Sequence, residues 1–146
     1  MRPGSRLGVD VGKARVGVAK CDPYGLLATP VITIARGDGD IAGIIAEARE
    51  VDAVEIVVGL PLSLSGRETP STQDARDFAA LIAEATPTPV RLVDERLSTV
   101  SAQRALQASG RNTRKSRPVI DQVAAVIILQ HALDFERSGG DRKSVV

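Results

Sequence analysis

Hydrophobic and polar residues alternate in the first part of the chain. One alternating run covers residues 7–12 (LGVDVG) and a second covers residues 16–19 (VGVA), as in two strands that each pack mainly through one face. The four residues between Val11 and Val16 predict a hairpin. A turn is predicted at residues 22–25 (DPYG), because Asp, Pro and Gly occupy its first, second and fourth positions. Residues 26–34 then predict a third strand, so the chain begins with three antiparallel strands.

The pattern next changes to helical spacing. Apolar residues recur at every third or fourth position over residues 41–48, after a segment rich in Gly and Asp, and predict a helix. Residues 54–60 form an apolar run that suits a strand covered on both faces, as in a parallel sheet. A capping-box pattern at residues 71–74 (STQD) predicts the start of a second one-sided helix that ends near Ala85. Residues 90–93 predict a short fifth strand.

Two further helices are expected near the C-terminus. Ser98 could cap a helix that Gly110 closes, and the last helix is predicted to begin near Pro118. Residues 119–133 are apolar nearly all round, which indicates burial against the sheet. Residues 138–146 have no periodic pattern, so we expect a disordered tail.

These elements predict one α/β domain over residues 1–137, with a mixed five-stranded sheet and helices on both faces. The length of 146 residues fits a single domain with one core. This order of elements, with an aspartate on the first strand, is analogous to that of the ribonuclease H-like fold.

Composition excludes several classes of protein. No run of about 18 apolar residues and no signal-peptide pattern is found, so we expect a cytoplasmic protein without membrane contact. The single cysteine, Cys21, and the single histidine, His131, exclude an internal disulfide and the usual zinc ligand sets, and we interpret both residues as structural. A net charge of +1 gives no global attraction to nucleic acid. Three aromatic residues argue against binding by base stacking.

An aspartate lies in the middle of the first apolar strand. Asp10 is flanked on the same strand face by Gly8 and Gly12, which we interpret as an open floor that leaves room for a ligand. A buried carboxylate without a partner is costly, whereas one that faces a cation is compensated. The alternative is a strand-end aspartate that accepts backbone hydrogen bonds.

Other acidic residues could join Asp10. Glu95, or its neighbour Asp94, follows the fifth strand, and Asp121 lies in the opening turns of the last helix. Three converging carboxylates would form an oxygen-rich site that suits Mg²⁺ or Mn²⁺, and two such ions can hold a scissile phosphate. The alternatives are a solvated pair at residues 94–95 and an Asp121 that interacts only with the positive end of its helix.

Positive charge is concentrated just before the last helix. Residues 111–117 (RNTRKSR) predict a phosphate clamp, with a solvated loop as the alternative. Further contacts to a nucleic-acid backbone are expected from the first hairpin and from the segment after the fifth strand. The full set of candidate nucleic-acid-binding residues is Lys13, Arg15, Arg96, Arg111, Arg114, Lys115 and Arg117. Residues 59–63 (GLPLS) lie where open α/β sheets commonly bind ligands, although a structural turn explains them equally well.

Four motifs resemble the YqgF/RuvX family of pre-16S rRNA nucleases and Holliday-junction-resolvase-like proteins. They are GVDVGKARVGVA (8–19), VVGLPLSLSG (57–66), VDERLST (93–99) and IDQVAAVIILQ (120–130), in the family's order over nearly the whole domain. The resemblance implies a ribonuclease H-like fold and a metal-dependent phosphodiesterase site.

The resemblance also implies roles for single residues. It implies that Asp10, Glu95 and Asp121 are the catalytic and metal-ligating acids, and it favours Glu95 over Asp94. The chain departs from the family's pattern at Ala14, where a second basic residue is common. It departs again at residues 64–65 (LS), which replace a more polar pair. The acidic set is intact, and the substrate contacts are left open.

Three functions are weighed on these grounds. The first is a magnesium- or manganese-dependent endonuclease that processes pre-16S rRNA ends, with ribosomal assembly partners, or one that resolves branched DNA, which would require a homodimer. The second is a catalytically silent nucleic-acid-binding factor in ribosome assembly, which would show salt-sensitive binding without turnover. The third is an actin- or sugar-kinase-like ATPase. The chain length argues against the third, because such enzymes hold nucleotide between two lobes.

Overall fold

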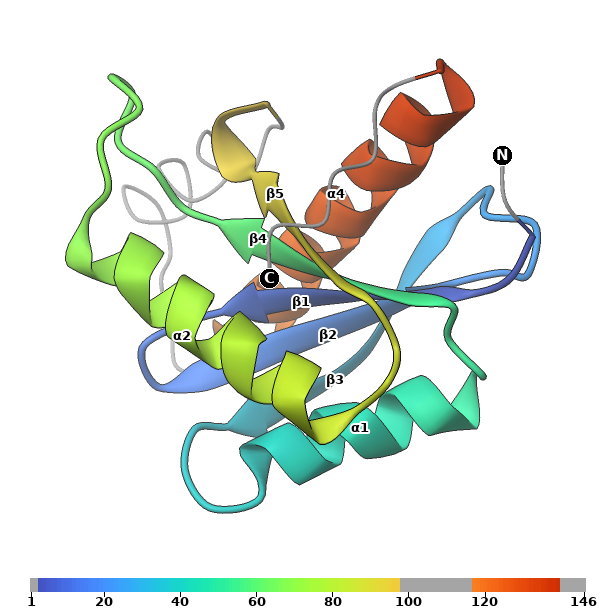
Figure 1. Cartoon of the computed structure of the whole chain (residues 1–146), viewed down its shortest axis with the longest axis horizontal. Helices are drawn as coiled ribbons and strands as arrows, with labels where there is room; N and C mark the ends of the chain where they lie inside the picture. Colours follow the sequence, from blue (N-terminus) through green and yellow to red (C-terminus); the bar gives the residue numbers. More distant parts are fainter. Residues whose placement is uncertain (1–2, 98–116, 140–146) are drawn as a thin grey trace.

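A five-stranded mixed sheet forms the centre of the molecule (Figure 1). The computed structural model describes residues 3–97 and 117–139, with side chains for 3–96 and 122–139. The strand order is β3-β2-β1-β4-β5, in which β1 to β3 are antiparallel neighbours and β4 and β5 run parallel to β1. The strands are β1 (Arg6–Val11), β2 (Arg15–Cys21), β3 (Ala28–Ala35), β4 (Glu55–Leu60) and β5 (Val90–Asp94).

Helices cover both faces of this sheet, as the sequence predicts. Helices α1 (Asp40–Glu50) and α2 (Pro70–Ala85) pack on one face, and α4 (Arg117–Arg137) packs on the other (Figure 1). A short 3₁₀ turn, η1 (Glu95–Leu97), follows β5. The helix expected over residues 98–110 lies outside the described residues. Of the expected tail, residues 138–139 form a turn after α4, and the rest also lies outside them.

Two hydrophobic clusters fill the space between the sheet and the helices. The strand residues Leu7 and Val9 point to the α1 and α2 side, where they are fully buried. On the opposite side, Ala125, Ile128 and Leu129 of α4 are buried against the sheet. Burying an aliphatic side chain contributes about 1.5–3 kcal/mol. The nearly all-apolar sequence of α4 is therefore explained by its position across four strands of the sheet.

The start of α2 differs from the prediction. The capping box uses Thr69 as the N-cap and Thr72 as its partner, two residues earlier along the chain than the expected N-cap at Ser71. Pro70 explains the difference, because proline suits the first helical position, where its missing N–H has no intrahelical partner. Thr72 also donates its hydroxyl to the carbonyl oxygen of Pro61, which ties the helix start to the loop after β4.

The turn at residues 22–25 is confirmed. The N–H of Gly25 donates to the carbonyl oxygen of Asp22 at 3.0 Å. The Asp22 carboxylate accepts the N–H groups of Leu27, Leu26 and Tyr24, and these bonds lower the pKa of the carboxyl. In the described part of the chain, no helix is long and apolar enough to cross a membrane.

Candidate active site

Helix α4 packs closely against β1 at Gly8, on the strand face that also carries Asp10. A Cβ atom added at Gly8 would lie 2.7 Å from the Cβ of Leu129 and 3.0 Å from the carbonyl oxygen of Ala125. The expectation that Gly8 leaves room for a ligand is therefore wrong, because the missing side chain allows α4 to pack closely on β1. Gly12 has a different role, since its N–H donates to the carbonyl oxygen of Arg15 at 2.9 Å and closes the β1–β2 hairpin.

Asp10 is a buried residue near the carboxyl end of β1, with 2% of its surface exposed. The recorded pairing of β1 with β4 ends at Val9 and Val58, so the next step along both strands places Asp10 beside Gly59. Gly59 in turn pairs with Val93 of β5. Because side chains alternate along strands and Val93 packs against α4, this row of residues faces α4.

Glu95 reaches the same row from η1. It follows Val93 by two residues and is 3% exposed. Its Oε2 atom lies 3.0 Å from the position that a Cβ atom at Gly59 would take. The structure thus brings Asp10 and Glu95 to one edge of the sheet, on its α4 face, and the absence of a side chain at Gly59 leaves space for the Glu95 carboxylate.

Asp94 is engaged differently from Glu95. Its carboxylate forms an ion pair with Arg96, with 2.7 Å between Oδ2 and Nη2, and also accepts the backbone N–H of Arg96. The side-chain hydrogen bonds from Arg96 lower the pKa of Asp94. The structure therefore separates two neighbouring acids, because Asp94 is held by a cation at the surface while Glu95 is buried beside Gly59.

The first turns of α4 pass over the row that contains Asp10. The side chain of Gln122 donates to Thr33 Oγ1 at 2.9 Å, and Thr33 pairs with Gly17, which pairs with Asp10. Asp121 precedes Gln122 in the same turn. Its backbone is therefore at the level of Asp10 along the strands, while its side chain lies outside the described part of the structure.

The candidate basic residues fall into two groups. Lys13 is exposed at the tip of the β1–β2 hairpin, and Arg15 is half-buried at its base. The hairpin is braced by Arg36, which donates to the carbonyl oxygen of Gly12 at 2.7 Å and forms an ion pair with Asp74 at 2.9 Å. Outside the described side chains lie Arg111, Arg114, Lys115 and Arg117.

The chemistry of the described donors suits a hard cation. Asp10 and Glu95 supply carboxylate oxygens, which Mg²⁺ and Mn²⁺ prefer over nitrogen or sulfur ligands. Among the side chains that the structure describes, no group of three or more His, Cys, Asp or Glu residues could hold a metal ion. The side chain of Asp121 is not among these described side chains.

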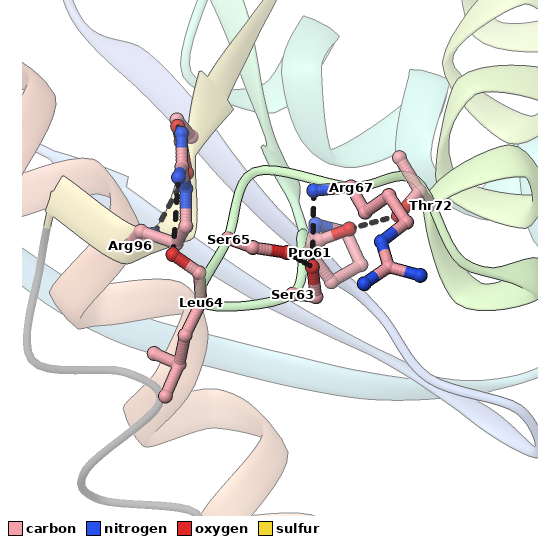
Figure 2. Close-up of polar contacts among 8 residues, drawn as sticks. Pro61, Ser63, Leu64, Ser65, Arg67, Thr72 and Arg96 are labelled. Carbon is pink, nitrogen blue, oxygen red and sulfur yellow. Dashed lines mark hydrogen bonds and ion pairs between the residues drawn. The ribbon is translucent and has the colours of Figure 1, made fainter.

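The loop from the end of β4 to α2 includes residues 59–63, which the sequence left open between a ligand site and a structural turn, and its internal hydrogen bonds were not predicted. Ser63 binds the backbone of Arg67 through both its N–H and its hydroxyl group, each at 3.0 Å, and Leu64 beside it is 90% exposed (Figure 2). Arg96 contacts this loop from η1. The two serines on either side of an apolar residue, followed by Gly66, were the available signal, since Ser and Gly favour tight turns.

Comparison with known proteins agrees with this architecture. Residues 4–135 match the family model described as RuvX, Holliday junction resolvase. A protein from Clavibacter michiganensis subsp. michiganensis is 66% identical over 143 residues, which cover 96% of this chain and 89% of that protein. A Nocardioides protein is 56% identical over 146 residues and covers 96% and 94% of the two chains. Both carry the name "Putative pre-16S rRNA nuclease".

Solved structures give the fold. RuvC from T. thermophilus, in complex with a Holliday junction substrate, matches with a TM-score of 0.61 at 16% identity and covers 97% of this chain and 99% of its own. The same protein in a second structure matches with a TM-score of 0.59. The predicted ribonuclease H-like α/β fold is confirmed.

Proposed function

Because the chain belongs to the RuvX Holliday junction resolvase family, we propose that it is a nuclease that hydrolyses phosphodiester bonds in structured nucleic acid, at the ends of pre-16S rRNA. The names of its relatives support this substrate. The structural observation that carries the proposal is the pair of buried carboxylates, Asp10 and Glu95, at one edge of the sheet. Both side chains supply carboxylate oxygens, the ligand type that Mg²⁺ and Mn²⁺ prefer.

We assign the catalytic and metal-ligating roles to Asp10, Glu95 and Asp121, with Mg²⁺ or Mn²⁺ as the cofactor. When bound, such an ion activates the attacking water and stabilises the leaving oxygen. The chain positions the acids from three elements, since β1 carries Asp10, η1 carries Glu95 and α4 carries Asp121. Asp10 is 2% exposed, and a charge interaction is stronger in such a buried setting than in bulk water.

Substrate contacts are proposed for the basic residues on either side of this edge. Lys13 and Arg15 on the hairpin, with the segment 111–117, would bind phosphates without reading bases. Arg96 has one third of its side chain exposed and is oriented by Asp94, so it can face a phosphate near Glu95. Recognition would therefore depend mainly on the shape of the nucleic acid.

A second substrate is favoured by the family description and by the RuvC likeness in fold. Resolution of a four-way DNA junction needs two active sites, so this activity would require a homodimer. A pre-rRNA substrate instead implies cytoplasmic location and ribosomal assembly partners, and does not require a dimer.

Cleavage assays distinguish these activities. End-labelled RNA that carries the 5′ flank of 16S rRNA and a synthetic four-way DNA junction are incubated with the full chain, with and without Mg²⁺ or Mn²⁺. We expect metal-dependent cleavage of the RNA, with a loss of at least about 100-fold in Asp10→Asn, because the variant keeps the shape of the side chain and removes its charge.

The matched control is Asp77→Asn, which removes an exposed carboxylate from α2, outside the proposed site. It should cleave at close to the wild-type rate. Wild-type cleavage by Asp10→Asn would contradict the assignment of the site, and RNA binding without any cleavage would indicate the catalytically silent binding factor.

A further inference from the structure

Leu64 is the most exposed of the large hydrophobic side chains that the structure describes. Its exposed fraction is 90%, compared with 57% for Leu26 and 51% for Leu81. Single exposed apolar residues are common on protein surfaces and need no explanation by themselves. The surroundings of Leu64 are what distinguish it, because its loop is ordered and lies against the proposed active site.

The loop that carries Leu64 is held by its own hydrogen bonds. Ser63 makes two bonds to the backbone of Arg67, and its hydroxyl lies 3.0 Å from that of Ser65. The N–H of Gly66 donates to the carbonyl oxygen of Ser63 at 2.8 Å, with Gly66 in the left-handed region at φ 87°. A loop ordered before binding loses little entropy when it contacts a partner.

The loop is also fixed to its neighbours on both sides. Thr72 of α2 binds the carbonyl oxygen of Pro61 at the start of the loop. On the other side, Nη1 of Arg96 lies 3.5 Å from the carbonyl oxygen of Leu64 and would lie 3.0 Å from a Cβ atom at Gly66. Because Arg96 directly follows Glu95, the loop is fixed beside a residue of the proposed site. In Figure 2 the side chain of Leu64 extends away from Ser63, Ser65 and Arg67.

We propose that Leu64 is an apolar wedge that packs against an unstacked base of the substrate next to the cleavage site. This inference rests on the proposed nuclease function. The faces of bases are the main apolar surfaces of a nucleic acid, and aliphatic side chains inserted between base steps stabilise an unstacked arrangement. None of the three aromatic residues lies in this loop: Phe78 is buried, Tyr24 follows β2 and Phe135 is near the end of α4. The apolar side chain that the loop offers is therefore aliphatic.

The position of the wedge selects a class of substrate. Arg96, the chain neighbour of Glu95, contacts the carbonyl oxygen of Leu64, so bases that flank a phosphodiester bound at Glu95 would lie within reach of Leu64. An uninterrupted duplex has no unstacked base to offer, and opening one costs a few kcal/mol. Nucleic acid with a branch, bulge or unpaired junction beside the scissile bond would therefore be preferred over continuous duplex.

The test measures base unstacking separately from cleavage. A stem-loop RNA with 2-aminopurine at the unpaired junction is titrated with the full chain in EDTA, which prevents metal-dependent cleavage. We expect 2-aminopurine fluorescence to rise with wild-type protein and not with Leu64→Ala. The affinity of Leu64→Ala for this RNA should be about tenfold weaker, because most of the buried area of one leucine is lost. Its affinity for a continuous duplex should be unchanged.

Two variants serve as controls. Leu64→Met keeps an apolar side chain of similar volume and should retain both the fluorescence rise and the affinity. Leu81→Ala removes an exposed leucine from α2 and should behave as the wild type. Urea unfolding checks that each variant is as stable as the wild type, which is expected because both leucines are exposed.

The outcomes separate the wedge from the nuclease. Wild-type fluorescence and affinity in Leu64→Ala would overturn the wedge, even if the protein cleaves RNA. Failure of wild-type protein to bind any of the RNAs would overturn the proposed function itself. A change from dimer to monomer in Leu64→Ala, measured by sedimentation with RNA affinity unaltered, would identify a self-association surface and would also overturn the wedge.

Discussion

Replacement of Gly59 by alanine should destabilise the fold, mainly through an overlap with Ile128. The new Cβ would lie 2.5 Å from Cδ1 of Ile128 and 3.0 Å from Oε2 of Glu95. Ile128 is 1% exposed, so it cannot move into solvent to relieve the overlap. Overpacking of this kind costs about 1–3 kcal/mol in the free energy of unfolding. The free energy of unfolding is measured by urea titration monitored by circular dichroism, and the m-value should equal that of the wild type.

If this overlap causes the loss of stability, a second substitution that shortens Ile128 should restore part of it. Ile128→Val removes Cδ1 and by itself should cost about 0.5–1.5 kcal/mol. In Gly59→Ala/Ile128→Val the closest overlap is gone, so the double variant should be more stable than the sum of the two losses predicts, by at least about 1 kcal/mol. Additivity to within about 0.5 kcal/mol would refute the packing assigned to Gly59.

The corresponding pair of substitutions at Gly8 and Leu129 should not restore stability. There the new Cβ would meet the Cβ of Leu129 and a backbone oxygen, and Leu129→Ala keeps that Cβ. Rescue should therefore fail in Gly8→Ala/Leu129→Ala. Cleavage gives a second readout at Gly59, because its alanine would still crowd the Glu95 carboxylate in the rescued protein, and activity should remain low while stability recovers.

Further predictions concern ion pairs, acid stability and the thiol. Arg6→Met should cost about 3–5 kcal/mol, because it breaks an ion pair whose two side chains are buried, Arg6 with Glu136. Arg76→Met, from an exposed pair with Glu68, should cost at most about 1 kcal/mol by the same urea assay. Arg36 holds the pKa of Asp74 below its usual value, so the stabilising effect of the carboxylate is present above the ordinary carboxyl pKa of about 4 and is lost as the pH falls through the lower folded value. The stability difference between wild type and Asp74→Asn, measured by thermal unfolding, should accordingly shrink as the pH is lowered below about 4, and a constant difference would contradict it. Burial raises the pKa of Cys21, so a thiol reagent at mildly alkaline pH should react far more slowly with native protein than with protein in guanidinium, and equal rates would contradict the buried position.

Local patterns predicted the elements because each pattern reports burial. Alternation over residues 7–12 identified β1, and the apolar run before Leu60 identified the central strand β4. The turn at Asp22 was also predictable, since its residues are close in sequence. The close approach of α4 to Gly8 was not, because Leu129 is more than 100 residues away and a glycine gives the same signal beside a ligand or a helix.

In the candidate site, too, local sequence predicted some features, while others depend on contacts between distant residues. The acidic residues stand out in the sequence, but strand parity alone could not decide between Asp94 and Glu95. The structure distinguishes them because β5 ends at Asp94 and η1 turns Glu95 toward Gly59. The serines and Gly66 indicate a turn around Leu64, but the contacts of this loop with Thr72 and Arg96 could not be predicted, because those two residues belong to other elements.

The most direct test of the proposed site is calorimetric titration of the full chain with Mn²⁺ in the absence of nucleic acid. Wild-type protein should bind Mn²⁺, and Asp10→Asn, Glu95→Gln and Asp121→Asn should each weaken the affinity by about tenfold or more, since each removes one charged oxygen ligand. Asp94→Asn should bind as the wild type does, because Arg96 already holds that carboxylate. Equal Mn²⁺ affinity in the wild type and in Asp10→Asn would contradict a shared cation at this edge of the sheet.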